Sequence, residues 1–135
     1  MQADRILETC LYVDDLDAAA AFYTRVLGLA VHSRVEGRHV FFSCGEAMFL
    51  LFNPAATRQA QAGGSGVPAH GGHGPGHVAF AARRADVDAW RDHLRRHAVA
   101  IEAEIEWPGG GRSIYFRDPA GNSLELATPA TWGLA

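Results

Sequence analysis

The chain has 135 residues, 48% of them hydrophobic and 20% charged, and its formal net charge is −3. This length is enough for one domain with a buried core, and the mixed, slightly acidic charge excludes the basic surface typical of nucleic-acid-binding proteins. The apolar runs are too short to span a membrane, and the N-terminus has no signal-peptide pattern. The two cysteines are too few for a disulfide framework. We therefore expect a cytoplasmic protein that binds neither nucleic acid nor membranes.

Residues 1–53 predict a strand, a helix and three further strands. Apolar and polar side chains alternate over 6–13, which is typical of a strand with Glu8, Cys10 and Tyr12 on its polar face. A helix is expected from the recurring apolar residues of 16–27, with a cap at 14–15 and an end at Gly28. Three strand-like stretches follow, at 30–35, 38–43 and 47–52.

Residues 54–76 are rich in Ala, Gly, Gln, Ser and Pro, and their hydrophobicity has no period. This composition predicts a linker or loop. It carries His70 and His73 just before the next strand. These two side chains either cover a site or supply another ligand or base there, or they are simply solvated.

Residues 77–135 repeat the first order of elements. A strand at 77–81 precedes a helix capped by Asp86, a strand at 100–107, a glycine-rich turn and a strand at 113–117. Asp118, Pro119 and Gly121 suit a type I turn before the last strand. The sequence thus predicts an α+β fold of two βαβββ modules, 1–53 and 77–135, whose curved mixed sheets form one domain around a central cavity.

Alternation places three side chains on strand faces that lie opposite the aliphatic faces of the same strands. They are Glu8, His77 and Glu125. An imidazole with two carboxylates can hold a divalent metal and leave positions open for substrate. The counterpart of Glu125 in the first module falls near Phe49. The alternative is a hydrogen-bonded cluster of the two carboxylates around a protonated imidazole, without metal.

Further residues are candidates for binding a substrate. Ser113 and Tyr115 share a strand face beside Glu125 and could orient a substrate oxygen, while Arg112 could hold an anionic group. The complete set of expected substrate-binding residues is Tyr12, Phe49, His73, Arg112, Ser113 and Tyr115.

Several motifs together resemble the vicinal oxygen chelate superfamily, which includes glyoxalase I, extradiol dioxygenases, fosfomycin-resistance thiol transferases and bleomycin-resistance proteins. They are the runs Asp14-Asp15-Leu16, Leu27-Gly28-Leu29, Gly76-His77-Val78-Ala79-Phe80 and Tyr115-Phe116-Arg117-Asp118-Pro119-Ala120-Gly121-Asn122, with Glu125 following. The resemblance implies a glyoxalase-like fold and a divalent metal (Ni, Zn, Mn, Mg or Fe) bound by Glu8, His77 and Glu125. Glyoxalase-like members use a fourth ligand, whose position here is near Phe49. The chain departs from the pattern twice, because Glu8 stands where histidine or glutamine is usual and the fourth ligand is absent.

These features favour a metal-dependent lyase or isomerase that chelates a small substrate through two oxygens, with Glu125 or Glu8 as general base. One alternative is a protein that sequesters a small molecule or antibiotic, as bleomycin-binding relatives do. Another is an extradiol-type dioxygenase. The resemblance also implies a homodimer, and the site can be built within one chain or across two.

Overall fold

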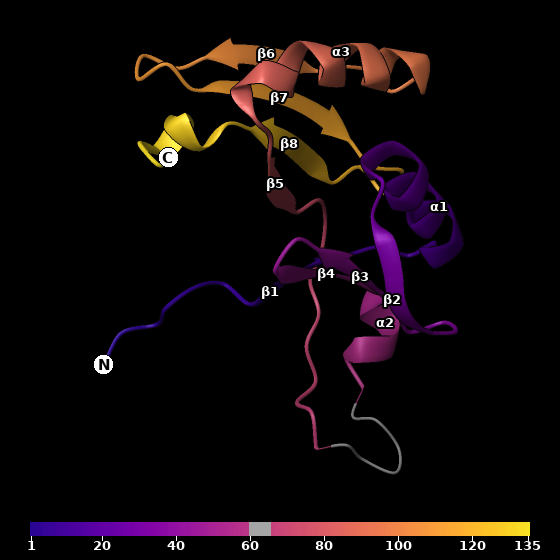
Figure 1. The fold of residues 1–135 in the computed structure, drawn as a ribbon. Coiled ribbons are helices and arrows are strands. Elements are labelled where there is room, and N and C mark those ends of the chain that lie inside the picture. Colours follow the sequence, from indigo (N-terminus) through magenta and orange to yellow (C-terminus); the bar gives the residue numbers. More distant parts are fainter. Residues whose placement is uncertain (60–65) are drawn as a thin grey trace. The chain divides into compact units, whose positions relative to one another are not determined.

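The computed structural model describes residues 1–59 and 66–135, so linker residues 60–65 lie outside the described part of the chain. It divides into two compact units, Met1–Gly74 and Pro75–Ala135. Each unit is a four-stranded mixed sheet accompanied by a helix (Figure 1). The α+β class and the repeated order of strand, helix and three strands are therefore confirmed. None of the helices in the described ranges is long and apolar enough to cross a membrane.

The first unit contains β1 (Glu8–Tyr12), α1 (Leu16–Leu27), β2 (Ala30–Val35), β3 (His39–Cys44), β4 (Ala47–Phe52) and α2 (Pro54–Thr57). Its sheet has the strand order β1-β4-β3-β2, in which β1 runs parallel to β4 and the other pairs are antiparallel. The short helix α2 falls in the stretch expected to be a linker. An N-terminal cap accounts for this helix, because the Asn53 side chain accepts a hydrogen bond from the Ala55 N–H at 2.9 Å.

The ends of α1 follow the predicted capping signals. The Asp15 carboxylate accepts the Ala18 N–H at 3.0 Å, and Gly28 takes the left-handed conformation with a φ of 66°. Tyr23, fully buried on the inner face of α1, contacts the rings of Phe42 and Phe49. The helix therefore covers one face of the sheet and leaves the other face available for a site.

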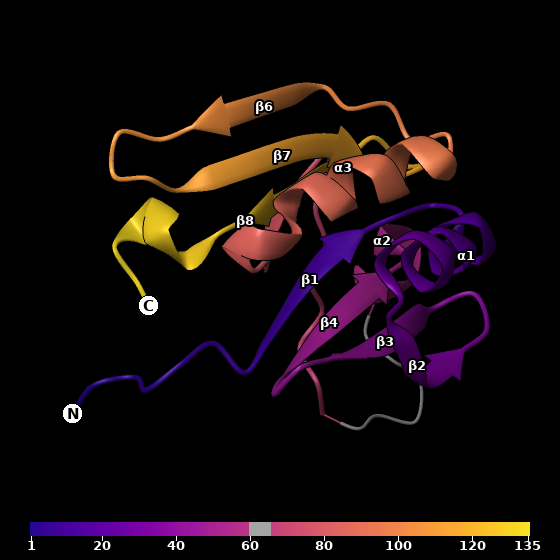
Figure 2. The same cartoon turned by 45° about the horizontal axis from the view of Figure 1, so that its top comes forward.

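The second unit contains β5 (His77–Ala81), α3 (Val87–Arg96), β6 (Ala103–Glu106), β7 (Arg112–Arg117) and β8 (Ser123–Ala127). Its sheet order, β5-β8-β7-β6, repeats that of the first, and α3 lies across it (Figure 2). Two boundaries differ from expectation. A 3-10 turn, Arg84–Asp86, precedes α3, and the Asp86 carboxylate accepts from Arg83 at 2.6 Å instead of capping the helix. Strand β6 begins three residues later than the alternation suggested.

The turn before β8 forms as predicted. The Gly121 N–H donates to the Asp118 carbonyl at 3.0 Å, and Gly121 has a φ of 86°. The Asp118 carboxylate accepts the Ala120 and Asn122 N–H groups at 3.0 and 2.8 Å. Asn122 in turn accepts the Gly76 N–H on its side-chain oxygen at 2.7 Å. This turn therefore ties the start of β8 to the start of β5.

Candidate metal centre and a cavity in the first unit

His77 and Glu125 meet on neighbouring parallel strands of the second unit. The register pairs His77 with Ser123 and Ala79 with Glu125. The Nδ1 atom of His77 lies 3.0 Å from the Ser123 carbonyl oxygen, which can only accept, so Nδ1 carries the proton. The other ring nitrogen, Nε2, lies 3.4 Å from a carboxylate oxygen of Glu125. The imidazole of His77 and a carboxylate oxygen of Glu125 therefore lie side by side.

Glu125 is a buried carboxylate on β8. The residue is 7% exposed, and the Tyr115 hydroxyl hydrogen-bonds to its carboxylate. Burial, and then this hydrogen bond, raise the pKa of Tyr115, so its hydroxyl stays protonated. Ser113 lies on the same face, buried, and accepts the Trp107 indole N–H at 2.8 Å. The carboxylate is thus held by the Tyr115 hydroxyl, which keeps its proton.

The donor set of His77 and Glu125 fits a divalent metal. A metal-binding histidine normally donates its second N–H to a carbonyl or carboxylate, as His77 does to Ser123. A neutral nitrogen and a carboxylate are ligands that Zn, Ni, Mn and Fe accept. Among the described residues, no three His, Cys, Asp or Glu side chains form a group that could hold a metal. A metal at this pair would complete its coordination with water, substrate or another side chain.

Glu8 occupies the equivalent place in the first unit. It pairs with Met48, and Cys10 pairs with Leu50, as His77 pairs with Ser123 and Ala79 with Glu125. Glu8 also lines a cavity of about 680 Å³ that belongs entirely to the first unit and lies on the sheet face away from α1. The other lining residues are Thr9, Cys10, Tyr12, Arg38, His39, Phe41, Leu50, Phe52, Val67, Pro68, Ala69 and His70.

The expectation that Phe49 faces the site is wrong. Phe49 is 1% exposed and its ring lies 4.9 Å from that of Tyr23, on the side covered by α1. Side chains alternate along β4, so the residue on the cavity side at this point is Leu50. Leu50 is therefore the register counterpart of Glu125, an apolar residue where glyoxalase-like proteins have their fourth ligand.

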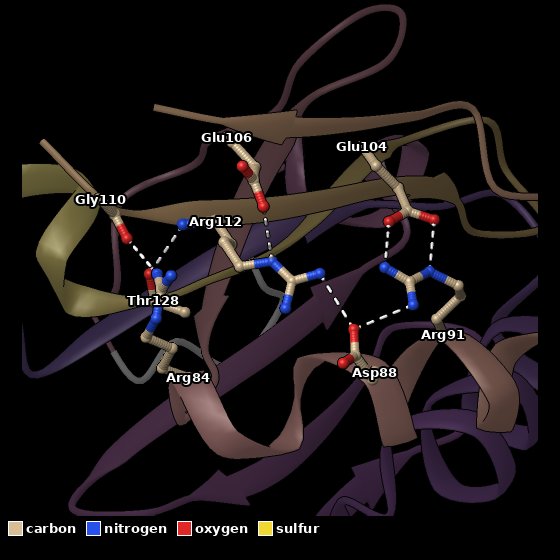
Figure 3. Close-up of polar contacts among 8 residues, drawn as sticks. All are labelled: Arg84, Asp88, Arg91, Glu104, Glu106, Gly110, Arg112 and Thr128. Atoms are coloured by element: carbon tan, nitrogen blue, oxygen red, sulfur yellow. Dashed lines mark hydrogen bonds and ion pairs between the residues drawn. The ribbon is translucent and has the colours of Figure 1, made fainter. Parts of the chain in front are cut away.

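Arg112 also points away from His77 and Glu125. Its guanidinium lies 3.0 Å from Asp88 of α3 and 3.7 Å from Glu106 of β6, on the helix-covered side of the sheet (Figure 3). Asp88 also pairs with Arg91, and these two arginines lower the pKa of its carboxyl. The expected role of Arg112 in binding a substrate anion is corrected to a structural one, because strand alternation places it opposite Ser113.

Residues 66–74, which we call the cover segment, lie over the first unit's cavity. The His70 N–H donates to the Thr57 carbonyl at 3.0 Å, and the Tyr12 hydroxyl lies 2.7 Å from His70 Nδ1. His70 thereby enters the cavity wall. His73, the expected substrate-binding histidine, instead lies 3.1 Å from the Arg58 guanidinium and is not part of the lining.

Comparison with known families gives a match over residues 5–126 to the model described as the glyoxalase/bleomycin resistance protein/dioxygenase superfamily. The chain belongs to this superfamily. The lactoylglutathione lyase structure from Agrobacterium tumefaciens is 43% identical, with a TM-score of 0.94, and the match covers 99% of this chain and 100% of that one. A glutathione transferase FosA from Serratia marcescens is 28% identical over 116 residues, which cover 86% of this chain and 74% of that protein. The FosX structure from Listeria monocytogenes, at 20% identity and a TM-score of 0.68, covers 94% of each chain and shares the fold.

Several important residues of this superfamily member had no role in the sequence analysis. His39, Phe41 and Phe52 line the cavity, and only the pairing of β3 with β4 shows that they share its face. Alternation within 39–43 indicated that His39 and Phe41 face the same way, but not which way. For Asn122, the sequence signal is its place as a polar residue directly after the turn glycine.

Replacing Tyr12 by Phe is expected to loosen the cover segment of this superfamily member. The change removes the hydroxyl that bonds to His70, and one such hydrogen bond contributes about 1 kcal/mol. Hydrogen exchange at the His70 amide should therefore become about fivefold faster. Amides of β3 and β4 are the internal control and should exchange at the wild-type rate. Unchanged exchange at His70 would show that this bond does not hold the segment.

His39 is expected to make stability depend on pH. Burial, and secondarily the charge of Arg38, lower its pKa from the ordinary value of 6.5. His39 then binds a proton more readily in the unfolded chain than in the folded one. Neutral His39 therefore makes its full contribution to the free energy of unfolding above pH 6.5, and this contribution is lost as the pH falls through the lower pKa of the folded state. Urea unfolding at about pH 7.5 and about pH 5 should show a smaller loss of stability for His39→Gln than for wild type. Equal losses would contradict the prediction.

Proposed function

We propose that this chain is a divalent-metal-dependent enzyme of lyase or isomerase type that binds a small substrate through two neighbouring oxygens. The observation that carries the proposal is the His77–Glu125 pair, with Nδ1 of the imidazole committed to the Ser123 carbonyl and Nε2 beside the carboxylate. Similarity to lactoylglutathione lyase and to FosA supports this class of activity.

We assign His77 and Glu125 as metal ligands and Glu8 as a third. Glu8 is included because its register position in the first sheet is the one His77 has in the second. The metal, Ni, Zn, Mn, Mg or Fe, would polarise substrate oxygens and stabilise developing negative charge. We also propose that the protein forms a homodimer.

The protein's own groups would then move a proton. Glu125 is assigned as the general base that takes a proton from substrate carbon and returns it, with Glu8 as the alternative. The Tyr115 hydroxyl steadies the Glu125 carboxylate, and its raised pKa keeps it a donor throughout. Ser113, held by Trp107, is assigned to orient a substrate oxygen.

The test begins with metal content. Protein purified without chelators is expected to contain stoichiometric divalent metal by elemental analysis. After chelation, restoring the metal to about 100 times its Kd should raise the free energy of unfolding by about 2.7 kcal/mol. The loaded protein is then assayed with hemithioacetals and with epoxides plus a thiol. Absence of metal, with no effect of added metal on stability, would overturn the proposal.

A second candidate function is sequestration of a small molecule without chemistry. The observation that favours it is the first unit's cavity, whose wall is largely aromatic and aliphatic. A sequestering protein would bind its ligand equally well with and without metal and would turn nothing over. The metal analysis above therefore separates the two functions.

A further inference from the structure

The cavity of the first unit has a wall built from rings in defined orientations. The rings of His39 and Phe41 stack at 3.9 Å with 9° between their planes. Phe52 stands edge-on to Phe41, at 5.3 Å and 76°, and Tyr12 lies 6.4 Å from Phe52. Offset-stacked and edge-to-face arrangements are those in which aromatic rings attract one another. A flat aromatic ring can add to this set in the same two ways, whereas a saturated ring cannot.

The cavity size suits a small organic molecule. Its volume of about 680 Å³ lies within the range of about 300–1,000 Å³ typical of ligand pockets. Val67, Pro68 and Ala69 of the cover segment complete the wall with apolar side chains. Tyr12 of β1 and His70 of the cover segment, both part of the lining, are bonded to each other. A bound ring would therefore be surrounded by apolar surface on several sides.

The two charged residues that line the cavity, Arg38 and Glu8, have opposite signs. The guanidinium of Arg38 donates to the Ala56 carbonyl at 3.1 Å. His39 is neutral at pH 7, because burial lowers its pKa. Glu8 contributes a carboxylate to the lining. Because Arg38 is positive and Glu8 is negative, the lining offers a ligand no net opposite charge, so a charged group placed here would lose hydration without compensation, which is costly.

We propose that this cavity binds the uncharged aromatic ring of the substrate, and that Phe41 and Phe52 select for it. The binding site itself stands on the geometry of the first unit, but its description as a substrate site rests on the proposed function.

Three probes with one carbon skeleton test the inference on chelator-treated wild-type protein. They are 2-naphthol, which is flat and uncharged, 2-naphthyl phosphate, which adds charge, and 2-decalol, which is saturated. By calorimetry, 2-naphthol is expected to bind at least about fivefold more tightly than either of the others. Equal or tighter binding of 2-naphthyl phosphate or 2-decalol would overturn the proposal.

Phe41→Leu tests the residue that is named. The exchange keeps an apolar side chain but removes the ring, so the affinity for 2-naphthol should fall about three- to tenfold while that for 2-decalol is unchanged. Phe80→Leu is the matched control, because Phe80 pairs with Leu126 in the second sheet, on its helix side. This exchange should leave 2-naphthol binding unchanged. Wild-type binding by Phe41→Leu would overturn the role of that ring. The wild-type probe series stays decisive if the variant does not fold.

Metal analysis of the same preparations keeps this inference separate from the proposed function. Selective 2-naphthol binding by a protein that takes up no metal would overturn the enzyme proposal and leave the cavity assignment standing. Metal uptake without selective 2-naphthol binding would overturn the cavity assignment and leave the enzyme proposal standing.

Discussion

Glu125→Gln is expected to weaken divalent-metal binding by at least about 100-fold, or about 2.7 kcal/mol, and to lower any metal-dependent activity at least as much. The exchange keeps the side chain's shape and an oxygen that accepts from Tyr115, but removes the negative charge beside His77. A neutral amide is a poorer ligand for a divalent cation than a carboxylate. Isothermal titration with Zn and Ni measures the affinity directly.

The matched control for this exchange is Glu106→Gln. Glu106 belongs to the same sheet, its side chain is 81% exposed, and its ion pair with Arg112 is long, at 3.7 Å. A surface pair of this kind contributes little, so metal affinity and stability should match wild type. Similar metal binding by Glu125→Gln and Glu106→Gln would mean that Glu125 is not a ligand.

Asn122→Ala is expected to lower the free energy of unfolding by about 3 kcal/mol. Asn122 is 1% exposed, and its side chain donates to Asp118 at 2.9 Å and accepts from the Gly76 N–H at 2.7 Å. The exchange removes the hydrogen bond to a buried carboxylate oxygen of Asp118 and the hydrogen bond from the Gly76 N–H. Urea unfolding followed by circular dichroism measures the change.

Asn53→Ala provides the comparison for that loss. Asn53 accepts the Ala55 N–H at the start of α2, so this variant loses a helix cap worth about 1 kcal/mol. Asn53 also donates to the Asp14 carbonyl at 3.4 Å, so the difference between the two variants measures how much more the buried link at Asn122 contributes than a cap with one long, exposed contact. A cost for Asn122→Ala no larger than that for Asn53→Ala would show that the link to Gly76 adds nothing.

The local elements followed from the sequence because each depends on neighbouring residues. Asp15 and Gly28 bound α1, and Asp118 with Gly121 make the turn before β8, as their side-chain and backbone preferences predict. The repeat of these signals gave the order of elements in both units. Alternation also placed His77 and Glu125 on one face of their sheet, where the structure brings them to 3.4 Å.

The relation between strands is where prediction from sequence failed. Alternation states which residues of one strand share a face, but it does not fix that strand's phase relative to its neighbours. The hydrogen-bonded register of β1 and β4 decides that Leu50, and not Phe49, is the counterpart of Glu125. Alternation along β7 already places Arg112 opposite Ser113, but only the packing of α3 on the sheet shows that it meets Asp88.

By itself, then, the sequence determined the two modules, their caps and turns, and the histidine and carboxylate that share a sheet face, because short-range sterics and hydrogen bonds act between residues close in the chain. Only the tertiary structure decided the aromatic lining of the cavity, the pairing of Arg112 with Asp88 and the bond from Gly76 to Asn122. These features join residues from separate elements, and their geometry arises from sheet register and packing against a helix.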